Sequence, residues 1–244
     1  MANSKIYLGS TNIGSLFQGA DDISIYLGEN KVYPLEWRGK FYATYSGGET
    51  YDLACDGNTT LTSGNTKPSG YEYSAMTEAI IGDCVTKIGY KAFSGCTSLT
   101  NIDIPTGVTS IGDGAFEGCS GLTTMDIPSG ITTIGQHTFY NCSSLTSIGI
   151  PNGVTSIGNA AFQNCRSLTS VTIPSGVTSI EYQAFVQCTS LNSITCLATT
   201  PPTLNYRVFN TGNSCPIYVP SASVNAYKTA DKWSDYASRI QAIP

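Results

Sequence analysis

Charged residues are scarce in this chain, and the shortage narrows the functions it can have. Asp, Glu, Lys and Arg make up 12% of its 244 residues, about half of the usual share. The net charge is −5 and the twelve basic residues are scattered. Nucleic-acid phosphates and anionic membranes both require clustered Lys and Arg. We therefore expect no nucleic-acid partner and no polybasic membrane contact.

Histidine and long apolar runs are also scarce. His137 is the single histidine, which excludes a multi-histidine metal site. No run approaches the roughly 18 apolar residues of a spanning helix, so we expect no membrane insertion. The first residues lack the apolar core of a secretory signal. We expect a chain that is used without secretion, or one whose leader is outside this sequence.

A 23-residue repeat fills the centre of the chain. Three apolar columns keep this interval through five copies. They are Cys96, Cys119, Cys142, Cys165 and Cys188; Phe93, Phe116, Phe139, Phe162 and Phe185; and Leu99, Leu122, Leu145, Leu168 and Leu191. A period between about 20 and 29 with the pattern Leu-x-x-Ile-x-Ile predicts a leucine-rich-repeat solenoid.

Each repeat predicts a short strand, a turn and a second buried stripe. Leu-x-x-Ile-x-Ile forms the strand, and the following Pro ends it because proline donates no ladder hydrogen bond. Ala-Phe-x-x-Cys has helical spacing, which predicts one short helical turn. Subtracting and adding 23 extends the register from Met76 to Val219. We therefore expect a parallel sheet of about seven strands in a solenoid at 76–220.

The five repeat cysteines are expected to be reduced and buried. Stacked strands hold them about 4.8 Å apart with parallel side chains. A disulfide needs Cβ atoms about 3.8 Å apart that face each other, and zinc needs tetrahedral convergence. Thiols that pack as small hydrophobes suit this ladder better. A reduced ladder also fits assembly in a bacterial cytoplasm.

Residues 1–75 are expected to form a β-hairpin module for attachment or capping. Ile6-Tyr7-Leu8-Gly9 returns as Ile25-Tyr26-Leu27-Gly28, and Ile13 corresponds to Val32, so each copy predicts strand, turn, strand. A further hairpin is expected on either side of 46–49. Aromatic side chains of the segment would leave an apolar patch, which marks an interface. The interface candidates are Tyr7, Tyr26, Tyr33 and Trp37.

Residues 221–244 are expected to close the last open edge as a helical cap. Ser221 to Ser223 can start a helix, and later apolar residues follow a mostly three-to-four spacing. These residues are Val224, Tyr227, Trp233, Tyr236 and Ile240.

The repeat Ile-Pro-x-Gly-Val-Thr-Ser-Ile-Gly-x-x-Ala-Phe-x-x-Cys-x-Ser-Leu-Thr resembles the BspA-like leucine-rich repeats of gut and oral bacteria. The ending from Ile217 through Tyr236 resembles that family's C-terminal sequence, so the resemblance covers about 76–244. It implies a right-handed solenoid used for adhesion and protein recognition, without catalytic residues or cofactors. The paired Ile-Tyr-Leu-Gly elements resemble short modules of tail-associated proteins of gut bacteriophages and prophages.

Two chemical sites are conceivable and both have simpler interpretations. His137 and Cys142 could form a catalytic pair, but Cys142 belongs to a ladder that needs no chemistry. Asp52, Asp56 and Asn58 suggest a calcium loop, but the distal Glu of an EF-hand is missing, so a β-turn is the better interpretation. We predict no enzyme, no metal and no cofactor.

The outward positions of the repeat strands form a surface of small polar side chains, acidic toward the N-terminal end. The candidate binding residues are Asn101, Asp103, Thr124, Asp126, Ser147, Ser170, Thr172, Ser193 and Thr195. The surface is either a solvated sheet face or a binding face, since solenoids present extended surfaces to partners.

The sequence leaves two classes of function open. One is a recognition or adhesion protein for a protein or surface glycan, as a virion component that binds the host or as an adhesin of the bacterial cell surface. The other is a structural spacer that assembles as a homo-oligomer or with a virion partner through residues 1–35.

Overall fold

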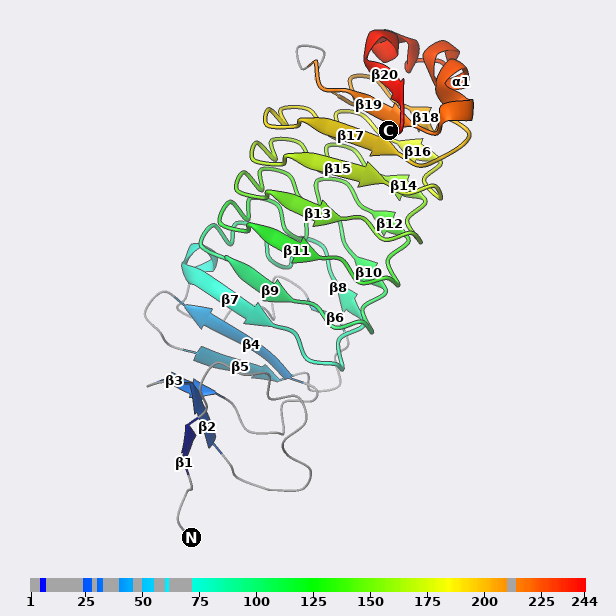
Figure 1. Cartoon of the computed structure of the whole chain (residues 1–244). Helices are drawn as coiled ribbons and strands as arrows, with labels where there is room; N and C mark the ends of the chain where they lie inside the picture. Colours follow the sequence, from blue (N-terminus) through cyan, green and yellow to red (C-terminus); the bar gives the residue numbers. More distant parts are fainter. Residues whose placement is uncertain are drawn as a thin grey trace.

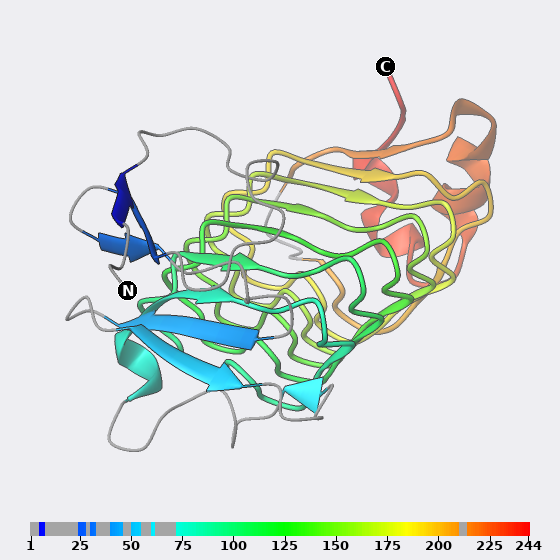
Figure 2. The ribbon, with the colours of Figure 1, turned by 90° about the horizontal axis from the view of Figure 1, so that it is seen from below.

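The chain forms a stack of coils closed at both ends (Figure 1). The structure, a computed structural model, describes residues 60–61, 72–209 and 214–244 with their side chains. Of residues 1–59 it describes only the backbone of five strands, at 5–7, 24–27, 30–32, 40–45 and 50–54. Seen from below, the coils trace closely similar outlines, as expected when each repeat has the same length and pattern (Figure 2).

The main sheet runs the length of the stack. In the described part of the chain its eight parallel strands are β7 (Met76–Ile80), β9 (Asn101–Asp103), β11 (Thr124–Asp126), β13 (Ser147–Gly149), β15 (Ser170–Ile173), β17 (Ser193–Cys196), β19 (Ile217–Val219) and β20 (Ile240–Ala242). Equivalent residues pair across neighbouring strands, as Met125 does with Ile148. The hydrogen-bonded ladders fall into three groups, with breaks between β9 and β11 and between β13 and β15. The predicted solenoid of about seven strands from Met76 to Val219 is confirmed.

A second sheet of two-residue strands forms another side of each coil. Within the described residues its strands are β6 (Thr60–Leu61), β8 (Lys87–Ile88), β10 (Ser110–Ile111), β12 (Thr133–Ile134), β14 (Ser156–Ile157), β16 (Ser179–Ile180) and β18 (Thr203–Leu204). The second residue of each of these strands, from Leu61 to Leu204, points inward and is buried. This confirms the predicted second stripe. The interval between paired residues is one residue longer at the last pair of strands, where Ser179 pairs with Thr203.

The remaining side of each coil is a run of hydrogen-bonded turns. The predicted helical turn at Ala-Phe-x-x-Cys is not a regular helix, because its i to i−3 bonds, such as Cys119 N–H to the Phe116 carbonyl, are not consecutive. The Gly118 N–H between them donates to the Tyr140 carbonyl of the next coil. The turn ends at a left-handed residue, which suits Gly and Asn. These residues are Gly95, Gly118, Asn141, Asn164 and Gln187.

The repeat phenylalanines pack into a continuous stack of rings. From Phe93 to Phe185 neighbouring ring centroids are 5.1–5.6 Å apart with planes within 9° of parallel. All five rings are buried, and Phe209 continues the stack into the C-terminal cap. The predicted core column is therefore confirmed, and its rings hold each coil against the next.

The repeat cysteines are buried free thiols, as predicted. Four of them also connect neighbouring coils. Their S–H groups donate to the Phe carbonyl 26 residues earlier, at S···O distances of 3.1–3.2 Å, from Cys119, Cys142, Cys165 and Cys188. Cys84, on the first described coil, is instead disulfide-bonded.

A β-hairpin closes the N-terminal end of the main sheet. β4 (Lys40–Tyr45) and β5 (Thr50–Ala54) pair antiparallel, which confirms the hairpin expected around 46–49. β4 then pairs antiparallel with β7, after the short 3-10 helix η2 (Tyr73–Ala75). The hairpin therefore covers the edge that the first repeat strand would otherwise leave open.

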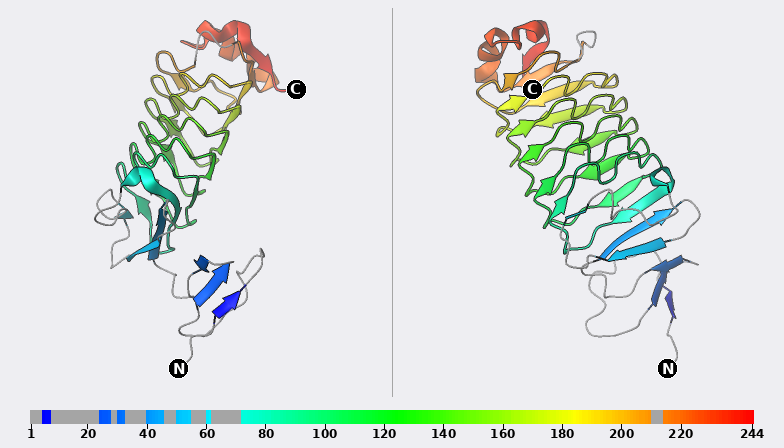
Figure 3. Two further views of the ribbon diagram at one scale, coloured as in Figure 1. Left: turned by 90° about the vertical axis from the view of Figure 1, so that its left-hand side faces the viewer. Right: turned by 180° about the vertical axis from the view of Figure 1, so that it is seen from behind.

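A separate three-stranded sheet lies beyond this hairpin. It contains β1 (Lys5–Tyr7), β2 (Ser24–Leu27) and β3 (Asn30–Val32). β2 and β3 form the hairpin expected for the second copy, and β1 pairs parallel with β2 so that Tyr7 faces Tyr26 in register. Ile13, expected in the first hairpin, is outside the described residues. Figure 3 shows this sheet past the N-terminal end of the stack.

The C-terminal cap contains helices and one more strand. Its helical elements are η3 (Ser221–Ser223), α1 (Val224–Thr229) and η4 (Ser234–Arg239). The expectation that Ile240 belongs to the helix is wrong, because β20 begins at Ile240 and pairs parallel with β19. Ile240 lies 23 residues after Ile217, so the repeat register outweighs the helical spacing.

The cap is held by buried aromatic side chains whose polar atoms have partners. The Trp233 indole N–H donates to the Pro202 carbonyl at 2.7 Å, and the Tyr227 hydroxyl donates to the Ala198 carbonyl at 2.8 Å. Their rings meet edge to face at 4.7 Å. The residues around Pro202 that depart from the repeat consensus thus provide the backbone acceptors to which the cap binds.

Candidate recognition surface

The predicted binding residues lie on the outward face of the main sheet, where the alternation of each strand places them. Seven of the nine are exposed, and Ser193 and Thr195 are half-buried. Their strand neighbours, such as Ile102 and Met125, are buried in the core. The structure therefore brings all nine together on one face, as the alternation predicts.

The sheet face is longer than the nine predicted residues. β7 adds Glu78 and Ile80, which pair with Asn101 and Asp103. At the other end β19 and β20 add Tyr218 and Gln241, which pair with each other. Sequence reasoning missed these ends because they depart from the consensus. The 23-residue register identifies them, since Glu78, Ile80 and Tyr218 lie one repeat from a predicted position and Gln241 lies two repeats from Thr195.

The acidic end of this face contains a shallow hollow of about 250 Å³. Asn101, Asp103, Thr124 and Asp126 line it together with buried apolar residues. Parallel register puts Asp103 and Asp126 at equivalent positions of β9 and β11. Small polar and acidic groups can accept and donate hydrogen bonds here, but no aromatic or arginine anchor lies among them.

The thiol ladder is unsuited to nucleophilic chemistry. Burial raises the pKa of the Cys142 thiol from 9.0 to about 12, so the thiol stays protonated at neutral pH. The Cys142 side chain has no exposed surface, and its Sγ is bonded to the Phe116 carbonyl. His137 lies at a left-handed corner with its ring 5.1 Å from that of Tyr140. The structure gives Cys142 the role of a core residue.

The other sequence candidates have different outcomes. Where side chains are described, no group of three or more His, Cys, Asp or Glu is arranged to bind a metal ion. Asp52 lies in β5, whereas Asp56 and Asn58 are outside the described residues. Tyr7 and Tyr26 lie on the paired strands β1 and β2, and Tyr33 and Trp37 are outside the described residues. Across the described elements no helix has the length and apolar character of a membrane span.

The coil geometry defines a class of protein. Parallel strands at a 23-residue interval, an inward Leu and Ile pattern and a turn side stacked with Phe constitute a leucine-rich-repeat solenoid. Residues 66–192 match the sequence model of the BspA type leucine rich repeat region in six copies. The chain belongs to this family, whose solenoids are typically binding scaffolds without catalytic activity.

Solved structures of bacterial leucine-rich-repeat proteins share the fold. The leucine rich repeat protein of T. pallidum is 22% identical with a TM-score of 0.50, and the match covers 87% of this chain and 99% of that one. The pneumococcal vaccine antigen PcpA is 16% identical with a TM-score of 0.58, covering 91% of this chain and 50% of that one. A Bacteroides ovatus protein is 27% identical with a TM-score of 0.42, covering 73% and 54%. The chain thus spans about half the length of the last two, and no curated protein sequence matches it.

Proposed function

We propose that this protein is a non-enzymatic recognition or adhesion protein of the bacterial cell surface that contacts its partner through the main sheet face. The observation that carries the proposal is the row of mostly polar side chains on parallel strands from Glu78 to Gln241, which are exposed along most of its length and half-buried near Ser193 and Thr195. Such a row serves no packing purpose, and a solenoid presents it as an extended, rigid surface.

The coils hold this surface firmly. Thr side chains on the turns donate to the carbonyl of the preceding coil, as Thr146 does to Thr123 at 3.1 Å and Thr169 does to Thr146 at 3.2 Å. A preorganised face loses little conformational entropy on binding, which favours a recognition role.

Three observations support a place at the cell surface. The family to which the chain belongs includes surface proteins of bacteria, and the pneumococcal protein of similar fold is a vaccine antigen. Cys84 is disulfide-bonded, and disulfides persist mainly in oxidising compartments. The reduced repeat thiols are compatible with this location, because they are buried beyond the reach of an oxidant.

A tail-associated phage protein is the second candidate. It rests on the resemblance of the paired Ile-Tyr-Leu-Gly elements to modules of phage tail-associated proteins, and Ile6 and Tyr7 of the first copy pair in parallel with Ile25 and Tyr26 of the second. The family match begins at residue 66 and does not extend to this element. In that role, or as a structural spacer, residues 1–35 would join the solenoid to a virion or to other copies of the chain.

Charge substitutions on two faces of the same coils test the binding face. Thr124→Arg with Ser147→Arg places bulky charges on the main sheet, whereas Ser110→Arg with Thr133→Arg places the same charges on the outward side of the second sheet. All four positions are exposed. Fluorescent beads that carry the full chain are measured for attachment to epithelial cells whose surface glycans have been removed with glycosidases. We expect the main-sheet variant to lose attachment and the second-sheet variant to retain it; equal attachment by both would overturn the assignment.

Fractionation tests the location. Protease treatment of intact cells that produce the full chain should remove it, and it should sediment with the cell envelope. Recovery with filterable virus-sized particles, protected from washing, would instead favour the phage candidate.

A further inference from the structure

A second column of side chains, all exposed except the half-buried Asn159, runs along the corner of the coils, away from the main sheet. It occupies the second position after each short strand of the second sheet. Its members, from the first coil to the last, are Tyr90, Asp113, Gln136, Asn159, Tyr182 and Tyr206. We call this column the corner ladder. In every coil the next residue is left-handed, with φ between 51° and 64°, so each ladder residue is placed at the start of a sharp corner.

The corner ladder contains the exposed aromatic side chains of the described part of the chain. Tyr90 is 66% exposed, Tyr206 57% and Tyr182 38%. Burying these rings in a core would stabilise the fold, yet all three stand at one repeat position in solvent. A tyrosine has few rotatable bonds and a large amphipathic surface, which makes it an efficient binding residue when exposed.

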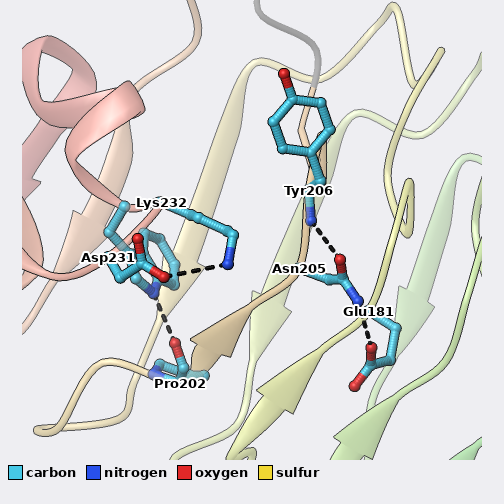
Figure 4. Close-up of polar contacts among 7 residues, drawn as sticks. Glu181, Pro202, Asn205, Tyr206, Asp231 and Lys232 are labelled. Carbon is cyan, nitrogen blue, oxygen red and sulfur yellow. Dashed lines mark hydrogen bonds and ion pairs between the residues drawn. The ribbon is translucent and has the colours of Figure 1, made fainter.

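The terminal tyrosines are held in place by their neighbours. The Lys91 ammonium lies 5.6 Å from the Tyr90 ring centroid, and the Arg207 guanidinium lies 5.6 Å from that of Tyr206. Asn205 accepts the Tyr206 backbone N–H at 2.7 Å and donates to Glu181 at 3.0 Å. Figure 4 shows the Tyr206 ring directed away from this Asn205 and Glu181 pair.

Planar polar side chains occupy the centre of the ladder. Asp113 accepts the Gln136 backbone N–H at 2.9 Å, which links two coils and fixes the Asp113 carboxylate. A hollow of about 330 Å³ lies between Tyr90, Asp113, Gln136 and His137. The ladder thus joins a concave polar site at one end to two aromatic rings on adjacent coils at the other.

Aromatic platforms together with carboxylate and amide groups are suited to carbohydrate. A pyranose ring offers a face of C–H groups for an aromatic ring and an edge of hydroxyls for Asp, Asn and Gln. The charges along the ladder leave a net charge of about −1. Lys91 pairs with Glu117 at 3.1 Å, Asp113 and Arg207 have opposite signs, and Glu181 adds one carboxylate. A polyanion would gain little here. We propose that the corner ladder binds a neutral glycan chain, with sugar rings stacked on Tyr182 and Tyr206 and hydroxyls bonded by the polar residues.

The dimensions agree with this occupant. Neighbouring coils lie about 4.8 Å apart where their strands pair and 5.1–5.7 Å apart between the stacked phenylalanine ring centroids, which is similar to the length of one sugar unit. A linear glycan lying along the stack would therefore meet a new ladder residue with each sugar. The inference deepens the proposed surface-recognition function by naming a ligand class and a face separate from the main sheet.

A glycan array with the full-length chain tests the proposal. The array contains neutral mannans, β-glucans, xylans and desialylated mucin glycans beside sialylated and sulfated glycans. We expect binding to at least one neutral glycan, weakened at least tenfold by Tyr182→Ala with Tyr206→Ala. Both rings are exposed, so the fold should persist, and unchanged thermal unfolding serves as the check. The main-sheet variant Thr124→Arg with Ser147→Arg is the matched control and should bind glycan as the unaltered chain does.

Each other outcome overturns the proposal. Absence of binding to every neutral glycan removes the ligand class, and binding to charged glycans alone gives the ladder the wrong chemistry. If the tyrosine variant still binds neutral glycans as the unaltered chain does, the binding site lies outside the corner ladder. If only the main-sheet variant loses glycan binding, the glycan site is on the main sheet face. The proposed adhesive function stands apart from these results, because bead attachment that depends on the main sheet would remain if every glycan failed to bind.

Discussion

At the residue scale, Phe139 lies in the middle of the stack of phenylalanine rings. Its fully buried ring lies 5.6 Å from that of Phe116 and 5.3 Å from that of Phe162. Phe139→Ala would leave a cavity inside the ring stack, so we expect the free energy of unfolding to fall by about 3–5 kcal/mol. Phe139→Leu fills most of that volume and should cost less than half as much. Urea denaturation measures both, and equal losses would show that the stacked ring itself contributes little.

The thiol ladder predicts a dependence of stability on pH. Burial raises the pKa of Cys142 and Cys188 from 9.0 to about 12. The unfolded chain releases these protons above pH 9 while the folded chain retains them. The contribution of these thiols to the free energy of unfolding is therefore fully present below pH 9. It decreases as the pH rises from 9 to about 12, by about 1.4 kcal/mol per pH unit for each thiol.

Serine variants isolate this effect. Cys142→Ser with Cys188→Ser keeps a donor for the carbonyls of Phe116 and Phe162 but does not ionise in this range. Between pH 9 and 11 the midpoint of urea unfolding should fall less steeply in the variant than in the unaltered chain. Parallel slopes would contradict the assignment, as would rapid labelling of the repeat thiols in the native protein at pH 8.

At the element scale, the sharp corners of each coil depend on left-handed residues. Gly118 has φ of 75°, and a Cβ there would find its nearest neighbour at 3.7 Å, so space is not the constraint. Gly118→Ala should therefore cost about 1–2 kcal/mol through backbone conformation alone. Gly149, on the exposed sheet face with open space around it, is the matched control, and Gly149→Ala should be neutral or slightly stabilising. Thermal unfolding distinguishes the two; equal effects would rule out a conformational origin.

The elements that repeat were the ones that could be predicted from sequence. The 23-residue register placed every main strand from Met76 to Val219, because each residue type recurs in the same environment. Ile240 was assigned to a helix because the tail's apolar spacing is helical, whereas pairing with Ile217 across the sheet decides its conformation. The turn at Phe116 and Cys119 has helical spacing over one turn, too short for periodicity to separate a helix from a β-turn.

The two candidate surfaces also differ in how far the sequence could predict them. The sheet face followed from strand alternation, which is visible as small polar residues between Ile and Leu. The corner ladder was missed because its position holds Tyr, Asp, Gln and Asn in turn, which share no pattern of hydropathy. What unites them is a left-handed corner, a backbone property that side-chain periodicity does not reveal.

At the scale of the whole molecule, the two ends of the solenoid are closed in different ways. The N-terminal edge is covered by backbone pairing, with β4 between β5 and β7. The C-terminal core is covered by side chains, as Trp233 and Tyr236 pack on Phe209 at 6.0 and 5.4 Å. A stack of repeats is a stable monomer only when both open surfaces are covered, and here segments of the same chain cover both ends.

This arrangement predicts that residues 1–35 can be removed without unfolding the coils. Among the described strands, β1, β2 and β3 pair with one another and with no strand of the main sheet. Deletion of 1–35 should leave the unfolding temperature of the coils nearly unchanged. If the segment joins copies of the chain, as proposed for an attachment module, light scattering should show a multimer for the full chain and a monomer for the deletion variant.

A proline in the capping hairpin provides the contrast. Ala43 lies in β4 opposite both Tyr51 and Ala79, so Ala43→Pro in the shortened chain removes a ladder donor from the central strand. We expect a clear loss of stability and aggregation through the uncovered edge of β7. Should deletion of 1–35 alone unfold the coils, the segment belongs to the cap. Should the full chain remain monomeric at high concentration, residues 1–35 do not join copies, and any attachment must be to a different protein.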